Sequence, residues 1–570
     1  MFRHTTIVRL SVAAATQLQP VLGWNRGNCS ANVTQMVQSN DSSLKPAWFI
    51  SLADPNNPIL TVEGCEAICD SKMGFYSDSA PRLITWLLPV ILLIGNMQFA
   101  PIGRKKFFMA LHLLGDPIHS TWSLLAKLGD WHRCFSSIRG QYPKKPSPDQ
   151  KRRMKSSMMI LAVAEELLVP WNIENTVLSL IPEEVSDDVL WETARALGES
   201  RKNELLRAIL AICWYMFEVL AAFIPAIGQS TSASGGKIAP AMLLSWLLPV
   251  VLLSNAIGGF SSLRNCEFFT SQYLQYLARL GKSRHDISIC KEQQSKFFKK
   301  NDSAPYFSSL AWSGAIYSYR SGKWPPETPG GKLLLALCSF LPVTLAFGLA
   351  FATLETAPTY FSCRSVLVAV IFYSWIMSTI ITWIASFLRS ITGRYLWYFI
   401  LIKDSFIAVP ALALIILTSC GFLNSCYCWS GALVLGRGKA SVPLNPVSAF
   451  YHNDHVIYPA MVATGLFLQI SFFLLILWTG RRCFWMMWWG NDVCPEEWKA
   501  STQSQAPTTG AASTTGALLE IQEGPELSQD ADQIEQIQSQ IKSSSAIAKD
   551  EKQEIVIKES SVVQVKAEDK

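Results

Sequence analysis

Hydrophobic residues are concentrated in seven long runs that are separated by polar stretches. A helix needs about 20 mostly apolar residues to cross the hydrocarbon core of a bilayer. The runs that reach or nearly reach this length are 83–100, 208–227, 241–260, 333–353, 365–386, 405–422 and 459–478. The run 158–164 is too short to cross, and we expect it in a soluble or interface-lying helix. The pattern therefore predicts an all-α polytopic bundle of about seven membrane spans.

The first and third runs resemble each other. The first reads TWLLPVILL from Thr85, and the third reads SWLLPVVLL from Ser245. The likeness continues past the runs, where LAKLG at 125–129 is matched by LARLG at 277–281. We interpret 83–227 and 241–353 as two copies of a span-loop-span unit in parallel orientation, an arrangement that flanks the substrate in some transporters. The alternative is that Trp-Leu-Leu-Pro is only a common way for a helix to enter a membrane.

Basic residues near the ends of the runs predict the orientation. Cytoplasmic loops carry an excess of Lys and Arg close to span ends. With seven spans, all of the following fall on one side: Arg104, Lys105, Lys106, Arg201, Lys202, Arg207, Arg264, Lys282, Lys299, Lys300, Lys332, Arg389, Arg394, Arg481 and Arg482. This predicts an external or luminal N-terminus and a cytoplasmic C-terminus, in the plasma membrane or a secretory-pathway membrane.

The N-terminal segment has features of a secreted region. Asn28, Asn32 and Asn40 each begin an Asn-x-Ser/Thr glycosylation signal. Residues 1–23 carry Arg3 and Arg9 before a modest apolar run, which suggests a weak signal peptide. The alternative is an uncleaved tail that the first span translocates. Residues 24–82 are thus predicted to be an external, glycosylated segment.

Seven cysteines fall outside in this topology, in a compartment that favours disulfides. They are Cys29, Cys65, Cys69, Cys363, Cys420, Cys426 and Cys428. The strongest disulfide candidates are Cys29, Cys65, Cys69, Cys426 and Cys428, and their pairing stays open because the total is odd. Cys65 and Cys69 also resemble half of a metal site, but no second pair follows at metal spacing.

The C-terminal third divides into three parts. Residues 365–478 hold spans five to seven with an external loop at 423–458. Residues 479–500 include the aromatic run 484–489, which we expect to lie along the inner membrane surface. Residues 501–570 are Ser/Thr/Gln/Ala-rich and then highly charged, so they cannot bury enough apolar area to fold alone and are predicted to be disordered.

Three ionisable residues lie inside or beside predicted spans. Glu218 is well inside the second run, and such a group is a functional candidate because it is costly in hydrocarbon. Its alternative role is a protonated structural carboxyl, since burial raises a carboxyl pKa. Lys403 and Asp404 precede the sixth run near its cytoplasmic end, where a structural ion pair is expected.

A metal site is a weaker hypothesis. On a continuous helix His112, Asp116 and His119 would share one face, as metal ligands often do. Gly115 and Pro117 interrupt that helix, and we expect these histidines to be solvated at the cytoplasmic surface. The external set of His452, Asp454 and His455 is equally weak because it lacks a further ligand at a fixed spacing.

Reaction motifs are absent from the sequence. It holds no phosphate-binding Gly-rich loop, His-Glu-x-x-His or Gly-x-Ser-x-Gly, so no cofactor is predicted. The basic segments are better explained by topology and lipid headgroups than by nucleic acid. We expect a non-enzymatic transporter of a small solute or ion, with the lipid bilayer as its partner and the oligomeric state open. The alternatives are a receptor with an external ligand site and a membrane-embedded enzyme using the His/Asp set.

Four stretches carry a family resemblance: 65–69, 86–89, Asn96-Met97 and the segment HLLGDPI at 112–118. In these the chain resembles a group of uncharacterised multi-pass membrane proteins of filamentous fungi. The resemblance covers the membrane region without the tail, and it implies a shared fold but no substrate or functional residue. Seven spans with an external N-terminus also suggest a G-protein-coupled receptor. The internal duplication and the two long cytoplasmic segments do not fit that family.

Overall fold

The computed structural model is mostly helical. It describes residues 26–39, 43–51, 59–69, 79–97, 105–167, 181–202, 205–221, 235–260, 268–270, 272–273, 276–277, 329–355, 361–387, 394–444 and 454–487. The predicted signal peptide and the predicted disordered tail lie outside these residues. Five helical segments are long and apolar enough to span a membrane, namely Ile238–Ile257, Leu333–Glu355, Cys363–Ala385, Tyr398–Cys420 and Val456–Trp485. Two apolar segments are shorter, Trp86–Gly95 and Leu205–Phe217.

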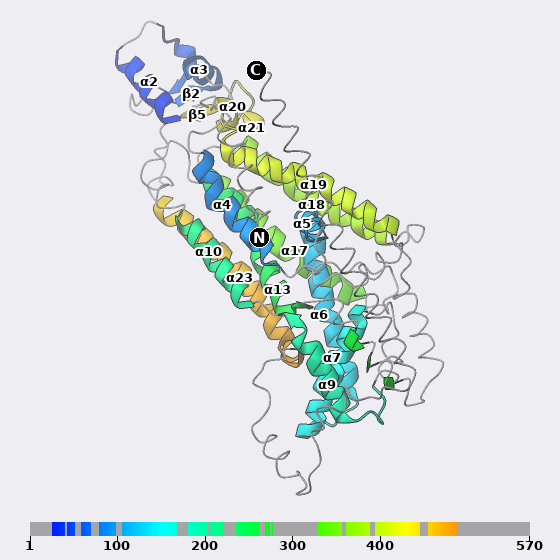
Figure 1. The fold of residues 1–570 in the computed structure, drawn as a ribbon. Coiled ribbons are helices and arrows are strands. Elements are labelled where there is room, and N and C mark those ends of the chain that lie inside the picture. The colour runs from blue at the N-terminus through cyan, green and yellow to red at the C-terminus, as the bar shows by residue number, and fades with distance from the viewer. Residues whose placement is uncertain are drawn as a thin grey trace, which may run out of the picture. The chain divides into compact units, whose positions relative to one another are not determined.

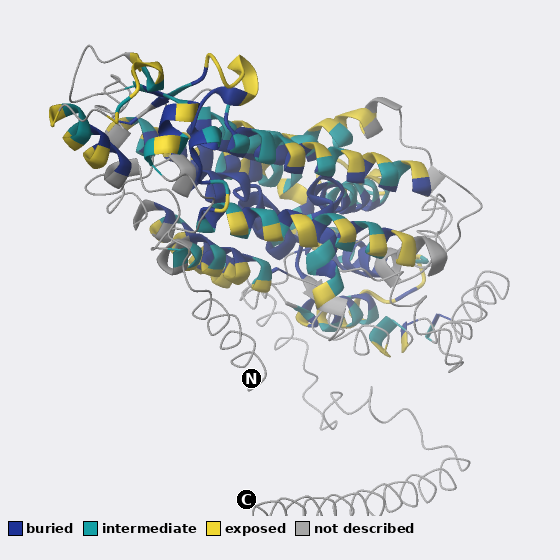
Figure 2. Ribbon diagram, turned by 90° about the horizontal axis from the view of Figure 1, so that it is seen from above, coloured by how far each residue is buried: buried dark blue, intermediate teal, exposed yellow. Residues whose placement is uncertain are grey.

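Within the described residues, each of the seven hydrophobic runs overlaps a helix or a pair of helices. The helices are α4 (Ser79–Gly95), α10 (Leu205–Ala221), the pair α12 (Gly235–Leu243) and α13 (Leu247–Ile257), α17 (Pro329–Glu355), α18 (Cys363–Phe387), α19 (Arg394–Cys420) and α23 (Asp454–Met487) (Figure 1). Their outward faces carry large apolar side chains such as Leu206, Phe406 and Phe467, which are 74%, 79% and 69% exposed. Buried residues lie between the helices and exposed ones on the outside (Figure 2). Apolar faces of this extent suit lipid rather than water.

The helices run in alternating directions. Ser79 Oγ donates to Cys420 O at 3.0 Å, which places the start of α4 beside the end of α19. Asn255 Nδ2 donates to Asn96 O at 3.0 Å, so the end of α13 lies beside the end of α4. Strand β3 (Arg201–Lys202), just before α10, pairs antiparallel with β4 (Gly259–Phe260), just after α13. Helix α10 therefore begins at the end of the bundle where α4 and α13 finish.

A small domain tied by disulfides lies beyond one end of the bundle, and we call it the disulfide cap. It contains α2 (Arg26–Gln38), the 3-10 turn η1 (Pro46–Trp48), β1 (Phe49–Ser51), β2 (Ile59–Thr61), α3 (Val62–Ile68), α20 (Cys426–Trp429), α21 (Ala432–Leu435) and β5 (Ser441–Pro443). The strands form an antiparallel sheet in the order β1-β2-β5, which joins the N-terminal segment to the loop before α23. Disulfides connect Cys29 to Cys69, Cys65 to Cys426 and Cys363 to Cys428. The last of them fixes the cap to the first residue of α18.

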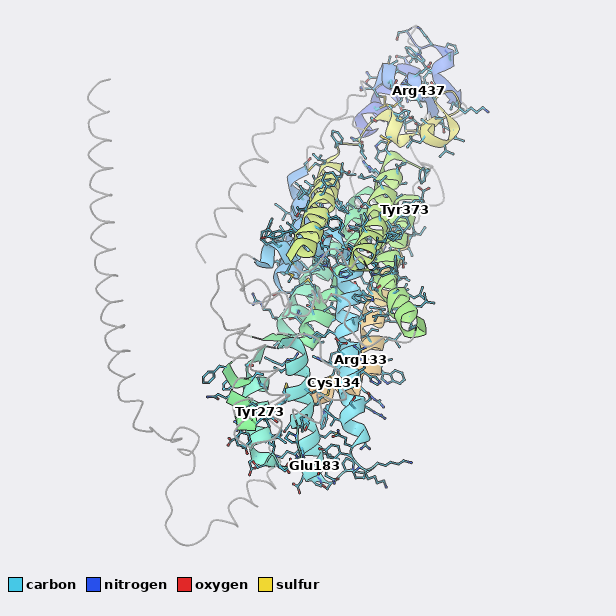
Figure 3. The ribbon with its side chains drawn as sticks, turned by 90° about the vertical axis from the view of Figure 1, so that its right-hand side faces the viewer. Arg133, Cys134, Glu183, Tyr273, Tyr373 and Arg437 are labelled. Atoms are coloured by element: carbon cyan, nitrogen blue, oxygen red, sulfur yellow. A yellow bond between two sulfur atoms is a disulfide. The ribbon has the colours of Figure 1, made fainter. Side chains whose placement is uncertain are left out.

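Between α4 and α10, the described residues form four further helices. They are α5 (Lys105–Gly115), α6 (Pro117–Gly140), α7 (Pro148–Leu167) and α9 (Asp187–Glu199). Helix α7 packs against α6 and α9, and it contains the run 158–164, of which residues 158–163 are buried. Arg153 of α7 binds the segment before α9, with bonds to Pro182 O and Val185 O. Arg437 in the cap and Glu183 ahead of α9 lie at opposite ends of this part of the protein (Figure 3).

The first aromatic residues after the last hydrophobic run continue the last helix. Helix α23 is continuous to Met487, so it includes residues 484–487 of the run. Phe484 packs edge-on against Trp131 of α6, with ring centroids 6.0 Å apart. Lys155 Nζ lies 5.8 Å from the ring of Trp485, which is 67% exposed. The position of the run along the inner membrane surface stays a prediction.

The two copies of the predicted repeat have different environments. Helix α4 exposes apolar side chains, including Ile84 and Ile91 at 58% and 54%, whereas α13 is buried along nearly its whole length. The helix formed by α12 and α13 is also broken at residues 244–246. Pro249 has no N–H to donate to Ser245 O, which instead accepts a bond from Leu248 N at 3.0 Å. The sequence likeness thus does not place the copies in equivalent surroundings.

We expect Gly115→Ala to destabilise the protein strongly. A Cβ at position 115 would lie 2.4 Å from Asp404 O and 2.8 Å from Asp404 Cα, so α5 would have to move away from α19. The control is Gly348→Ala in α17, where a Cβ would meet nothing within 4 Å. This control should be neutral or stabilising by about 0.5–1 kcal/mol. Thermal unfolding of both variants in detergent checks the prediction, and equal midpoints would contradict the close approach.

Candidate functional site

A helix break at Asp116 forms the centre of the site. Helix α5 ends at Gly115 and α6 begins at Pro117, with the Asp116 carboxylate accepting a bond from His119 N at 3.1 Å. Asp is a favoured N-cap residue, and proline suits the first helical position because its missing N–H is not needed there. The Gly-Asp-Pro sequence thus places a carboxylate at the junction of two helices. Asp116 is fully buried.

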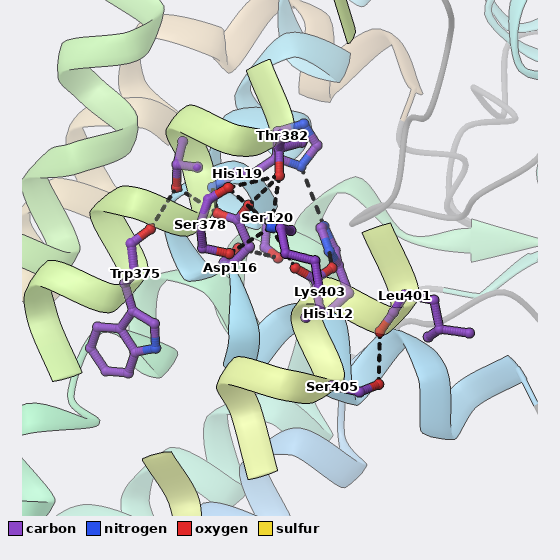
Figure 4. A network of polar contacts seen from close by, with 12 residues as sticks. His112, Asp116, His119, Ser120, Trp375, Ser378, Thr382, Leu401, Lys403 and Ser405 are labelled. Atoms are coloured by element: carbon purple, nitrogen blue, oxygen red, sulfur yellow. Dashed lines mark hydrogen bonds and ion pairs between the residues drawn. The ribbon is translucent and has the colours of Figure 1, made fainter. Parts of the chain in front are cut away.

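Helices α18 and α19 supply the other partners of this carboxylate. Thr379 Oγ1 donates to Asp116 Oδ1 at 2.5 Å, and Thr382 Oγ1 donates to Oδ2 at 2.7 Å. Lys403 Nζ lies 3.0 Å from Oδ2 and completes an ion pair (Figure 4). The carboxylate therefore accepts hydrogen bonds from four groups on three helices, which offsets the cost of burying its charge.

The Lys403 ammonium is equally well surrounded. It donates to Ser378 O at 3.0 Å, to Ser378 Oγ at 2.5 Å and to Thr382 Oγ1 at 2.8 Å. It also lies 2.7 Å from Asp404 Oδ1, so it forms ion pairs with two carboxylates. Its side chain is only 8% exposed. An ammonium so enclosed is stable only with partners of this kind.

A line of imidazoles extends from the second carboxylate. His112 Nδ1 lies 2.5 Å from Asp404 Oδ2, and His112 Nε2 lies 3.3 Å from His119 Nδ1. The His119 ring stacks on Trp122, with centroids 5.4 Å apart and planes at 25°. We call His112, Asp116, His119, Lys403 and Asp404 the buried charge network.

Two residues of the buried charge network, Asp116 and His119, lie on the segment between the apolar helices α4 and α10. Their surroundings shift the pKa of both side chains. Burial opposes the charged form of Asp116, but Lys403 and the two histidines outweigh it and hold its pKa below the usual range. Burial also lowers the pKa of His119 to about 4, although the Asp116 carboxylate acts in the opposite direction. At neutral pH Asp116 is therefore ionised and His119 is uncharged.

The structure unites two sets of residues that the sequence analysis treated separately. The predicted ion-pair residues Lys403 and Asp404 lie against the metal candidates His112, Asp116 and His119. The expectation that the histidines are solvated is wrong, because His112 and His119 are 2% and 4% exposed. The sequence reasoning also missed Ser378, Thr379 and Thr382. Their only signal in the sequence is their spacing, because Thr379 and Thr382 follow Ser378 by one and four residues and this places the three hydroxyls on one side of α18.

The donor set does not favour a metal ion. Asp116 already accepts four hydrogen bonds, and one of its donors is the Lys403 ammonium, whose positive charge would repel a metal cation. His112 directs Nδ1 at Asp404 and Nε2 at His119, so both ring nitrogens have partners. The residues fit an ion-pair network better than a coordination sphere.

The remaining candidates fall elsewhere. Glu218 belongs to α10, but its side chain lies outside the described residues, as do the side chains of Asn28, Asn40, His452, Asp454 and His455. Asn32 is exposed on α2, where a glycan could be attached. The sulfur atoms of Cys29, Cys65 and Cys69 lie close enough together for a metal ion. All three are in disulfides, so they offer no thiolate ligand.

Comparison of the chain with known protein families, curated proteins and solved structures finds no match. What is established is the class, a mostly helical protein whose described residues include five helical segments that could cross a membrane. The resemblance to fungal membrane proteins stays a prediction.

We expect Lys403→Met to destabilise the protein by about 3–5 kcal/mol, because it leaves the buried Asp116 carboxylate without its cation. Lys403→Met combined with Asp116→Asn should recover part of this loss, since the second change removes the unpaired charge. Equilibrium unfolding in mixed detergent micelles measures both. The control is Ser405→Ala, which removes only a bond to Leu401 O on the same helix and should cost far less. Additive effects in the double variant would show that the two charges do not interact.

Proposed function

We propose that this protein is a seven-span membrane transporter that moves a small solute or ion past the buried charge network. The observation that carries the proposal is the network itself, in which five ionisable side chains are buried against the apolar helices α18 and α19. Ionisable groups at such positions are costly and are retained where they serve an ion or substrate pathway.

Broken helices add support for transport. Transporters commonly bind substrates and ions where a helix is discontinuous, because the break presents free backbone groups and helix ends. Here α5 and α6 break at Asp116, and α12 and α13 break at residues 244–246. We propose Asp116, Lys403 and their partners as the functional centre. Glu218 stays a second candidate for a group that lines a pathway.

The proposed topology places the disulfide cap outside the cell or in the lumen. Two disulfides within the cap and a third that joins it to α18 are typical of an oxidising compartment. The alternating helix directions put the start of α4 at the cap and its end at the opposite side, where the basic residues that follow it are expected in the cytoplasm. In this topology α4 and α10 act as spans despite their shorter apolar length. The gene-duplication origin of the two halves stays a prediction from sequence.

A sensing role is the second proposal. Cys363, the first residue of α18, is bonded to Cys428 in the cap. The same helix carries Ser378, Thr379 and Thr382, which contact Asp116 and Lys403. A ligand bound by the cap could therefore bias the network through α18.

The topology predicts both the disulfides and the glycans. Non-reducing mass spectrometry of the full-length protein should recover peptides that join Cys29 to Cys69, Cys65 to Cys426 and Cys363 to Cys428. Asn32→Gln should remove one glycan, because the exposed Asn32 lies in the cap. Alkylation of the six cysteines without prior reduction, together with an unglycosylated protein, would contradict an external cap.

Transport should depend on the network. Proteoliposomes that contain the purified protein are exposed to a panel of amino acids, sugars and inorganic ions while current is recorded on a solid-supported membrane. We expect current with at least one probe, reduced at least tenfold by Lys403→Met and unchanged by Ser405→Ala. Folding of each variant is checked by size-exclusion chromatography. Absence of current from folded wild-type protein across the panel would contradict transport, and loss of a signalling response after deletion of the cap would favour sensing.

A further inference from the structure

The charges of the network do not balance when both histidines are neutral. Asp116 and Asp404 carry one negative charge each, and Lys403 carries one positive charge, so these described groups sum to −1. Helix α18 contributes neutral groups to them, namely the hydroxyls of Ser378, Thr379 and Thr382 and the Ser378 carbonyl. A net charge is expensive in a site of low dielectric constant. One additional positive charge would neutralise the network.

The two carboxylates differ in their capacity to accept that charge. Asp116 already accepts hydrogen bonds from His119 N, two threonine hydroxyls and the Lys403 ammonium. Asp404 instead faces an imidazole, with its Oδ2 atom 2.5 Å from His112 Nδ1. A metal cation at Asp404 Oδ2 would have to displace His112. It would also lie beside the Lys403 ammonium, which is 2.7 Å from Asp404 Oδ1. A proton on His112 neutralises the same carboxylate and requires no displacement.

The histidine pair can pass such a proton along. The contact from His112 Nε2 to His119 Nδ1 holds one hydrogen, which either nitrogen can donate. When His112 is neutral with its hydrogen on Nδ1, Nε2 accepts from His119 Nδ1–H. When His119 takes a proton at Nε2, its Nδ1 hydrogen can pass to His112 Nε2, leaving His119 neutral with its hydrogen on Nε2. His112 then becomes an imidazolium whose Nδ1–H donates to Asp404. No other bond changes in this step.

We propose that the ion bound by this network is a proton, carried as an imidazolium on His112 against Asp404 and exchanged through His119. This inference rests on the proposed transport function, because it names the coupling ion for the same site. Asp116 and Lys403 then form a fixed ion pair that holds the α5–α6 break in place. The titratable and charged groups that set the proton affinity are Asp404 and Lys403 on α19 and Asp116 and His119 on the α5–α6 segment.

The test is ¹⁵N NMR of the full-length protein labelled at histidine and held in lipid nanodiscs. The chain has seven histidines, and imidazole nitrogen shifts separate the two neutral tautomers from the imidazolium. His112→Gln and His119→Gln assign the two signals. Between pH 8 and pH 5 we expect the His112 signal to convert to imidazolium in step with a tautomer change at His119. Two histidines that stay neutral down to pH 5 in the wild-type protein would overturn the proposal.

The Asp404→Asn variant isolates the role of the paired carboxylate. It removes the negative charge with little change in volume, so converting His112 to imidazolium should need at least a tenfold higher proton concentration. His132→Gln is the matched control, because His132 is exposed on α6 outside the network, and it should delete one signal without moving the other transitions. An unchanged His112 transition in folded Asp404→Asn would contradict the pairing.

The two proposals fail in different ways. If His112 forms an imidazolium but no current flows in proteoliposomes, the proton site is supported and the transport function is contradicted. If current flows but does not respond to an imposed pH gradient, and both histidines stay neutral, transport is supported and the proposal that the ion is a proton is contradicted.

Discussion

The buried ion pair between Asp116 and Lys403 is the interaction on which the site depends. Removing Lys403 would leave the Asp116 carboxylate buried without its cation, and a buried isolated charge is far more costly than a paired one. The pair also fixes backbone, because Asp116 is the N-cap of α6 and its carboxylate is held by hydroxyls of α18 and the ammonium of α19. The same contacts thus satisfy a charge, start a helix and join three helices.

The two helix breaks are connected through a pair of tryptophans. Trp375 of α18 donates from Nε1 to Leu114 O at 2.9 Å, directly before the Asp116 break. Its ring meets Trp246 edge-on, with centroids 5.9 Å apart, and Trp246 lies in the break between α12 and α13. A carbonyl near a helix end needs a donor when water is excluded. These contacts join the α5–α6 break to the most deeply buried of the helical segments that could cross a membrane.

The disulfide cap lies at the start of α18 and the end of α19, away from the part of each helix that contributes to the buried charge network. Cys363–Cys428 anchors the first turn of α18, and Ser79 of α4 is bonded to the last residue of α19. Covalent links reduce the freedom of the chain whether or not the bundle is folded. Helices α18 and α19 are therefore held at the cap, and farther along they carry the hydroxyls, the ammonium and the second carboxylate of the network.

The sequence by itself determined that the chain forms apolar helices long enough to cross a membrane, because about 20 apolar residues in a row and the exclusion of unpaired backbone from lipid admit few other structures. It also identified the cysteines that form the cap, the Lys403–Asp404 pair and the unusual set of His112, Asp116 and His119. Only the tertiary structure brought the Lys403–Asp404 pair together with the histidine and aspartate set. His112 and Asp404 are 292 residues apart in the sequence. Periodicity shows which residues share a face, but it does not show which face meets which helix. The histidines were therefore expected in solvent. Packing buried them instead, because the rotation of each helix is set by its neighbours.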